Sequence, residues 1–157
     1  MTTMLANPPP TKSAELEISS FYLGDALMGV PIDQIEEINH QFDLTPVPHA
    51  PACVRGLINL RGRVVTVIDL RVVLGMEPAT LTRQSCNVVV RSHGEQIGIV
   101  VDRIADVVRT RQTDIEPSPA NVAGIDGQYF RGVCKLLGEL LVILDMEKIF
   151  SVDRHGH

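Results

Sequence analysis

The side chains that could do chemistry are scattered along this sequence rather than grouped. Histidines and cysteines occur at His40, His49, His93, His155 and His157, and at Cys53, Cys86 and Cys134. A zinc site needs several such ligands at short, characteristic spacings. No histidine here has a Cys, Asp or His at such a spacing, so we expect no metal site. His155 and His157 are interpreted as residues of a polar C-terminal tail.

Catalytic motifs are equally scarce. Ser118 lies in a proline-rich stretch with no neighbouring base in the sequence, although a triad assembled from distant residues stays open. The sequence has no glycine-rich phosphate loop, no paired-histidine helix motif and no nucleophile elbow. It therefore predicts a protein that is not an enzyme and holds no cofactor. A deep pocket with clustered, pKa-perturbed side chains would revive the enzyme alternative.

Composition narrows the remaining classes. The 157 residues include 14 basic and 19 acidic ones, for a net charge of −5, and 45% are hydrophobic, as in one ordinary folded domain. A nucleic-acid module usually carries a basic face and stacking aromatics, whereas this chain is acidic and has four Phe, two Tyr and no Trp. A small-barrel nucleic-acid binder therefore stays a minor alternative, with salt-dependent oligonucleotide binding as its sign.

Cellular location is predicted from what the sequence lacks. Its longest apolar run, Leu140 to Leu144, is far too short to cross a bilayer core of about 30 Å, and no secretory signal is visible. The three cysteines are far apart, which suits buried thiols in a reducing compartment. We expect a cytoplasmic protein without direct membrane insertion.

The chain contains an internal repeat. Residues 55–70 and 131–146 share Arg, Gly, Leu, Gly and Asp at an offset of 131 − 55 = 76. Residues 29–38 match 98–107 at 98 − 29 = 69, and residues 43–48 match 114–119 at 114 − 43 = 71. Three blocks in the same order indicate that one supersecondary unit is used twice.

Each unit reads as short strands joined by Gly and Pro turns. Gly62 separates two apolar runs as in a hairpin, and Gly138 does the same in the second copy. The runs Val64–Ile68 and Leu140–Leu144 are nearly continuous, so we expect both faces of these strands to be covered. The predicted architecture is all-β with a few short helices, in two small barrels side by side with a groove between them.

Four aspartates recur in both copies and are interpreted as helix caps rather than catalytic carboxylates. Asp69 is predicted to cap a short helix through Leu74, and Asp145 a helix over Met146–Phe150. Asp33 and Asp102 are predicted to start one-turn helices.

Features found in only one copy are better candidates for function. Asn59 and Arg61 in the first copy correspond to Lys135 and Leu137 in the second. The planar guanidinium of Arg61, beside a turn glycine, suits recognition of carboxylates or helix-end carbonyls on a partner. An internal ion pair with Glu36 or Glu37 is the alternative. Leu137 indicates that the fold does not need a charge at this place.

The repeated blocks resemble the signature of the CheW family of bacterial chemotaxis coupling proteins. The resemblance rests on residues 55–62, with their Asn-Leu-Arg-Gly motif, on residues 64–71, and on residues 98–102 followed by Ile104 and Val107. It extends over about residues 17–150. It implies two SH3-like five-stranded barrels and an adaptor that couples methyl-accepting chemoreceptors to the histidine kinase CheA.

The resemblance also implies partners and a site. Receptor-binding candidates carried over by motif or by the comparison of copies are Ile35, Glu37, Gly56, Asn59, Arg61 and Gly98. The partners would be the receptor's cytoplasmic hairpin tip and the regulatory, CheW-like domain of CheA. Residues on the kinase side stay unassigned. The protein would be recruited through these partners to membrane-associated receptor arrays.

The alternatives within this family concern the pathway and the domain context. An adaptor of a non-flagellar pathway, for surface motility or second-messenger control, stays open. A chain of 157 residues leaves no room for a kinase or receiver domain, which favours a free-standing adaptor. We expect an N-terminal tail over 1–16, one domain over 17–150 and a C-terminal tail over 151–157. The domain would consist of two halves at about 17–80 and 85–150, with strand exchange between them left open.

Overall fold

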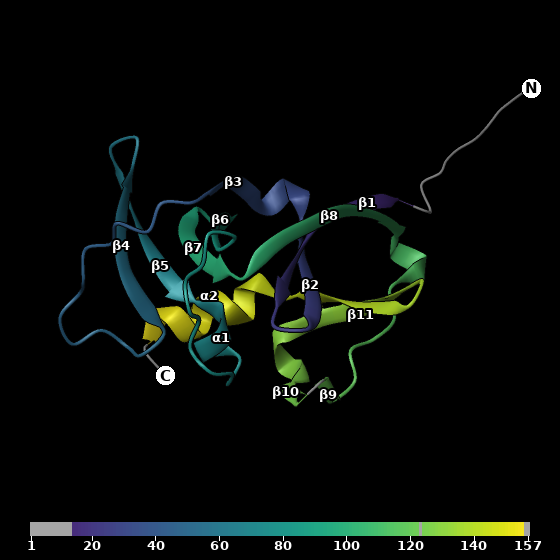
Figure 1. Cartoon of the computed structure of the whole chain (residues 1–157). Helices are drawn as coiled ribbons and strands as arrows, with labels where there is room; N and C mark the ends of the chain where they lie inside the picture. Colours follow the sequence, from purple (N-terminus) through teal and green to yellow (C-terminus); the bar gives the residue numbers. More distant parts are fainter. Residues whose placement is uncertain (1–13, 123, 156–157) are drawn as a thin grey trace, which may run out of the picture.

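Two five-stranded sheets lie side by side in the computed structural model, which describes residues 14–122 and 124–155, with only the backbone for 152–155 (Figure 1). The first sheet, in spatial order, contains β11 (Phe130–Leu136), β12 (Glu139–Leu144), β2 (Ala26–Pro31), β1 (Glu15–Leu23) and β8 (Arg103–Arg111). The second contains β3 (Ile35–Asn39), β6 (Cys86–Ser92), β7 (Glu95–Val101), β5 (Arg63–Asp69) and β4 (Val54–Leu60). The all-β prediction is confirmed.

The remaining elements are short. A two-stranded sheet pairs β9 (Asn121–Val122) with β10 (Ile125–Asp126). The helices are α1 (Leu70–Val73), α2 (Met146–His155) and the one-turn 3-10 helices η3 (Ile32–Gln34), η4 (Gln112–Asp114) and η5 (Gly127–Tyr129). No helix among the described residues is long and apolar enough to cross a membrane.

The two copies of the repeat exchange strands. Strands β1 and β2 of the first copy join β8, β11 and β12 of the second, while β3, β4 and β5 join β6 and β7. Equivalent strands take equivalent places. Val67 of β5 pairs with Gly98 of the parallel strand β7. Its repeat equivalent, Ile143 of β12, pairs with Gly29 of the parallel strand β2. Each sequence half therefore supplies strands to both sheets, and each sheet needs both halves.

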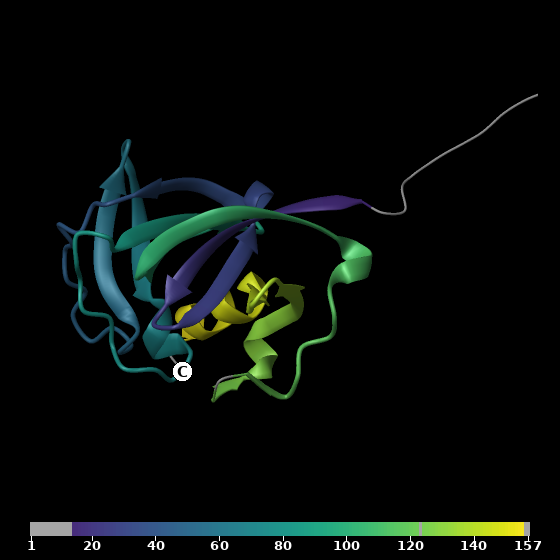
Figure 2. The ribbon, with the colours of Figure 1, turned by 45° about the vertical axis from the view of Figure 1, so that its right-hand side comes forward.

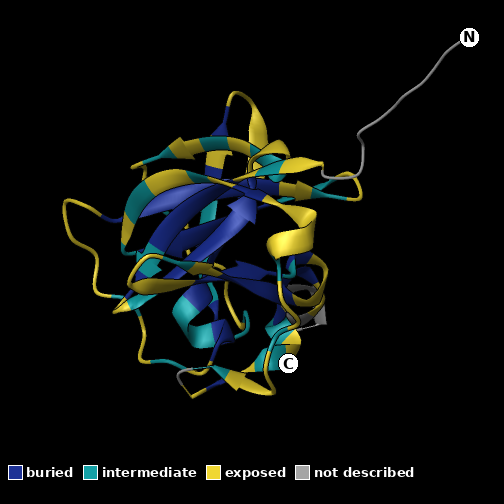
Figure 3. Cartoon of the chain, turned by 90° about the vertical axis from the view of Figure 1, so that its right-hand side faces the viewer, coloured by how far each residue is buried: buried dark blue, intermediate teal, exposed yellow. Residues whose placement is uncertain are grey.

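Buried side chains form three clusters that follow this arrangement. The largest lies between the sheets and includes Phe21, Ile99 and Leu144, together with Ile149 from α2. A second cluster, around Val67, lies on the opposite face of the second sheet, and a third, around Ile143, lies on the opposite face of the first. Figure 2 shows α2 running beneath the strands, and Figure 3 shows the buried strands at the centre with exposed loops around them.

Two of the four predicted aspartate caps are confirmed and two are wrong. Asp69 accepts a hydrogen bond from the backbone N–H of Arg71 at 3.1 Å, and Asp145 accepts one from that of Glu147 at 3.1 Å. Asp102 is instead followed directly by β8 and forms an ion pair with Arg71. Asp33 lies inside η3, whose first residues receive no side-chain cap.

The ends of the ordered domain also differ from expectation. Helix α2 continues to His155, because no Gly or Pro interrupts the sequence before Gly156, so residues 151–155 are helical rather than a tail. Strand β1 already includes Glu15 and Leu16. Most of the expected N-terminal tail, and His157, lie outside the described residues.

Candidate partner-binding site

Three of the six candidate site residues lie in one row across the second sheet. The strand register pairs Gly56 with Val67, Val67 with Gly98, Gly98 with Val89, and Val89 with Glu37. Residues directly opposite one another in neighbouring strands point to the same face of a sheet. Glu37, Gly56 and Gly98 therefore belong to one face.

Gly56 allows a loop to approach this row closely. A Cβ atom at Gly56 would lie 2.7 Å from the carbonyl oxygen of Thr45, and the glycine has a φ of 147°. The neighbouring residue Leu57 exchanges two backbone hydrogen bonds with Thr45, of 2.9 and 2.8 Å. Gly56 therefore shapes the surface by admitting the Thr45 backbone.

Asn59 and Arg61 form the tip of the β4–β5 hairpin. Arg61 and Gly62 both have positive φ, 51° and 83°, which is the backbone of a tight hairpin turn. The side-chain oxygen of Asn59 accepts a hydrogen bond from the N–H of Gly62 at 2.9 Å. Asn59 thus holds the turn that projects Arg61.

Arg61 is anchored by Glu37 and still exposed. Its Nη1 lies 2.6 Å from Oε1 of Glu37, and the side chain of Arg61 is 80% exposed whereas that of Glu37 is 18% exposed. Hydrogen bonds from Asn39 and then from Arg61 lower the pKa of Glu37, so this carboxylate stays charged. Arg61 therefore forms the internal ion pair that the sequence left open as the alternative, with Glu37 as its partner. This ion pair still leaves most of the five N–H donors of the guanidinium facing solvent.

A shallow hollow of about 80 Å³ lies beside this ion pair. Its lining residues are Glu36, Glu37, Leu60, Arg61, Arg63, Val65, Val89 and Gln96. Glu36 is hydrogen-bonded by Gln96 and forms an ion pair with Arg91, so Glu37 rather than Glu36 is the partner of Arg61. A hollow this small and open suits contact with a side chain of another protein rather than enclosure of a substrate.

Ile35 is not brought to the same face. The register of β3 shifts between Ile35 and Glu37, so Ile35 pairs with Val90, whose side chain belongs to the core between the sheets. Ile35 packs, half-buried, against that core. It supports the strand that carries Glu37.

Sequence reasoning missed one exposed apolar residue at this end. Val64, in the run expected to be covered on both faces, is 67% exposed beside the turn that carries Arg61. The signal was its position two residues after the turn glycine Gly62, at the end of the hairpin, where a strand has little sheet beside it. In the second copy, the corresponding tip carries Leu137 fully exposed, so the two hairpin tips differ in chemistry.

Two of the other chemistry-bearing side chains, His40 and Ser118, have local partners. Nδ1 of His40 lies 2.9 Å from the carbonyl oxygen of Ser85, and the hydroxyl of Ser118 donates to the carbonyl of Pro119 at 3.2 Å. All three cysteines are buried, and none of them forms a disulfide among the described residues. Among the described residues, no three His, Cys, Asp or Glu side chains are grouped so that they could hold a metal ion.

Comparisons with known proteins give one consistent result. The model of the CheW-like domain matches residues 17–154. The chain is 32% identical to chemotaxis protein CheW of Treponema pallidum over 92% of this chain and 87% of that protein. It is 33% identical to chemotaxis protein CheW of Thermotoga maritima over 87% and 89%. In structure it is similar to scaffolding protein TtCheW from Thermoanaerobacter tengcongensis, with a TM-score of 0.79, 27% identity and coverage of 89% and 90%.

Proposed function

The chain belongs to the CheW family, and from that premise we propose that it is a chemosensory adaptor that couples chemoreceptors to the histidine kinase CheA. Its activity is then the formation of contacts rather than the turnover of a substrate. It acts in the cytoplasm and joins membrane-associated arrays through its partners.

The exposed, anchored guanidinium of Arg61 carries this proposal. Glu37 fixes where Arg61 stands, and the Asn59 turn fixes the direction in which it projects. A fixed arginine loses little conformational freedom on binding, and its planar donors match a carboxylate or the last carbonyls of a helix. The cytoplasmic hairpin tip of a chemoreceptor offers helix-end carbonyls and carboxylates of this kind.

Neighbouring residues make this end suitable for a protein partner. Exposed Val64 adds apolar area beside Arg61, and Gly56 keeps the Thr45 loop close to the sheet. We assign the receptor contact to this end of the second sheet. The regulatory domain of CheA then binds elsewhere on the molecule. Pairwise contacts of this type are modest in area, and an array adds avidity.

An assembly assay tests the proposal. The full chain is mixed with a receptor cytoplasmic fragment and CheA, and the complex is collected by sedimentation. We expect a ternary complex with the wild type and its loss with Arg61→Glu, because the reversed charge repels the same acceptors. The matched control is Arg83→Glu, which makes the same change at another exposed arginine.

Two results would contradict the proposal. The absence of any sedimenting complex with the wild-type chain would reject the adaptor function. Normal assembly by Arg61→Glu, with normal kinase activation, would leave the adaptor function in place and remove Arg61 from the receptor contact.

A further inference from the structure

An arginine–aspartate pair that occurs in both copies of the repeat is used differently in each. In the first copy, Oδ1 of Asp69 caps α1 through the N–H of Arg71. Oδ2 of the same carboxylate accepts from Nη1 of Arg55 at 3.3 Å and from the backbone N–H of Ala79 at 2.9 Å. Asp69 is fully buried, so each of its oxygens has partners.

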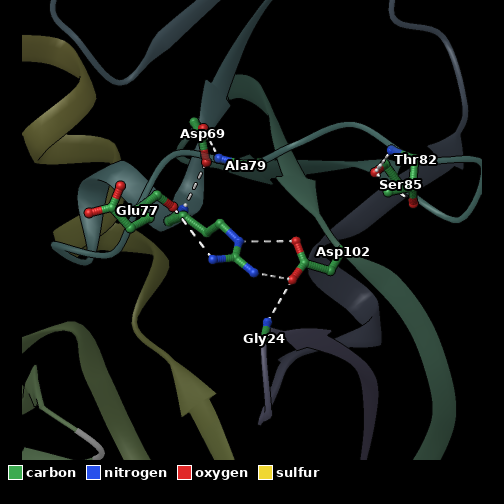
Figure 4. A network of polar contacts seen from close by, with 8 residues as sticks. Gly24, Asp69, Glu77, Ala79, Thr82, Ser85 and Asp102 are labelled. Atoms are coloured by element: carbon green, nitrogen blue, oxygen red, sulfur yellow. Dashed lines mark hydrogen bonds and ion pairs between the residues drawn. The ribbon is translucent and has the colours of Figure 1, made fainter.

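This pair holds an extended segment of the chain itself. Besides the N–H of Ala79 on Asp69, Arg55 donates to the carbonyl of Ala79 at 3.3 Å, and Arg71 donates to the carbonyl of Glu77 at 3.5 Å. Figure 4 shows Ala79 beside Asp69, and Glu77 near the neighbouring guanidinium. All three hydrogen bonds are made with backbone groups of the segment, so its binding does not depend on the identity of its side chains.

The corresponding pair in the second copy, Arg131 and Asp145, holds no such segment among the residues that the structure describes. Oδ1 of Asp145 caps α2 through the N–H groups of Glu147 and Lys148. Within residues 14–122 and 124–155, Oδ2 of Asp145 and the guanidinium of Arg131 have no hydrogen bond or ion pair. In the first copy, by contrast, both Oδ2 of Asp69 and the guanidinium of Arg55 are hydrogen-bonded.

Arg131 and Asp145 line an open groove of about 490 Å³. Its rim carries His93, whose Nε2 lies 2.5 Å from a carboxylate oxygen of Glu147, and Arg91, which is paired with Glu36. The groove is lined by basic side chains and by carboxylates, so it is not a site for a simple anion or cation. Among the described residues, its charged groups without a partner are Oδ2 of Asp145 and the guanidinium of Arg131, one acceptor and one set of donors, which a peptide backbone can satisfy.

We propose that this groove binds an extended peptide segment of a partner protein, in the manner in which the first copy binds the backbone of residues 77–79. The peptide N–H donates to Oδ2 of Asp145, and the adjacent carbonyl accepts from Arg131. The proposal is independent of the receptor contact at Arg61, because the groove and the hollow beside Arg61 share no lining residue, although Arg91 of the groove is paired with Glu36 of the hollow.

A synthetic peptide with the sequence of residues 75–83, blocked at both ends, is the probe, since this sequence fills the equivalent place in the first copy. It is titrated into the isotopically labelled full chain, and backbone amide shifts are followed by NMR. We expect saturable shifts at Arg131, His93 and the start of α2. A second peptide with proline in place of Ala79 lacks the N–H that Asp145 accepts, and we expect it to bind at least about tenfold more weakly.

Variants of the chain test the same contacts. Asp145→Asn keeps an N-cap oxygen but replaces the second acceptor by a donor, and Arg131→Ala removes the guanidinium. We expect each to weaken peptide binding about tenfold while the thermal transition stays cooperative. Arg111→Ala is the control for loss of an exposed arginine away from the groove, and should bind as the wild type does.

Three outcomes would overturn the proposal. The first is the absence of saturable shifts. The second is equal binding of the proline peptide, or shifts confined to Arg55 and Asp69, which would mean that the probe only displaces the internal segment. The third is tight binding only after removal of residues 1–13, which would assign the groove to the chain's own N-terminal residues rather than to a partner.

Discussion

Arg61 and Glu37 join the two edges of the second sheet. Glu37 lies in β3 at one edge and Arg61 at the tip of the β4–β5 hairpin at the other, yet Nη1 and Oε1 are 2.6 Å apart. A flat five-stranded sheet would separate its edge strands by roughly 19 Å, at about 4.8 Å per step. The ion pair therefore spans the mouth of a strongly curled sheet and fixes an exposed cation there.

Exchanging the two charges separates the structural role of Arg61 from its contact role. The double variant Glu37→Arg with Arg61→Glu keeps an ion pair across the mouth of the sheet but makes the exposed side chain at position 61 negative. We expect it to unfold in urea within about 1 kcal/mol of the wild type, because the ion pair is kept with its charges exchanged and its residue-61 end is exposed. We also expect it to lose at least about tenfold in receptor binding, measured by titration with a receptor fragment.

The single variant Glu37→Gln is the companion to that experiment. It keeps Arg61 but removes the charge that orients it, so we expect a smaller loss of receptor binding than with Arg61→Glu. Wild-type receptor binding by the double variant would mean that the ion pair alone matters and that Arg61 does not touch the partner.

The two glycines of the row differ in how closely they are packed. An alanine Cβ at Gly56 meets the Thr45 carbonyl at 2.7 Å in a backbone of positive φ, whereas at Gly98 it meets a side-chain methyl of Val67 at 3.3 Å, which a shift of a few tenths of an ångström relieves. We expect Gly56→Ala to lower the free energy of unfolding by about 2–4 kcal/mol and Gly98→Ala by less than about 1.5 kcal/mol. Urea unfolding of both variants checks the order, and a larger loss at Gly98 would contradict it.

Sequence reasoning found the repeat because each copy keeps the same turn glycines and capping aspartates. It left strand exchange open, because an offset between Gly56 and Gly132 says which residues are equivalent but not which strands pair. Both the exchanged and the unexchanged arrangement bury the same apolar residues. The choice depends on the geometry of the connections, which periodicity does not encode.

The candidate site was predictable in part for a similar physical reason. The contrast of Arg61 with Leu137 identified the hairpin tip that we propose as the receptor contact, but whether Glu36 or Glu37 pairs with Arg61 depends on a register shift in β3. The same shift turns Ile35 away from the site. Asp102 was misread because an aspartate before a turn can serve equally as a cap or as an ion-pair partner, and Arg71 lies 31 positions away in the sequence.

Burial makes the cysteines unreactive in the native protein. Cys53, Cys86 and Cys134 are each at most 5% exposed, and desolvation raises the pKa of Cys86, which further lowers its thiolate fraction. We expect a thiol reagent such as DTNB to label none of them rapidly in buffer and all of them in guanidinium chloride. Rapid labelling of one thiol in the native protein, identified by peptide mapping, would contradict this expectation and show that the structure around that cysteine opens locally.

The Arg71–Asp102 pair gives the fold a defined response to acid. Desolvation by itself raises the pKa of Asp102, but hydrogen bonds from Arg71 and from the N–H of Gly24 outweigh it, so the pKa is lowered from its ordinary 3.8. A carboxyl whose pKa is lowered in the folded state stabilises the fold fully at pH values above its ordinary pKa. This stabilisation is lost as the pH falls through the lowered pKa.

Asp102→Asn should therefore lower the free energy of unfolding by about 1–3 kcal/mol at neutral pH, because Arg71 loses its charged partner. The cost should shrink below pH 3.8. Urea unfolding at both pH values measures the difference. The control is Asp33→Asn at the repeat-equivalent position, where the side chain is exposed and has no such pair within the described chain. A pH-independent cost for Asp102→Asn would mean that packing, not charge, holds Arg71.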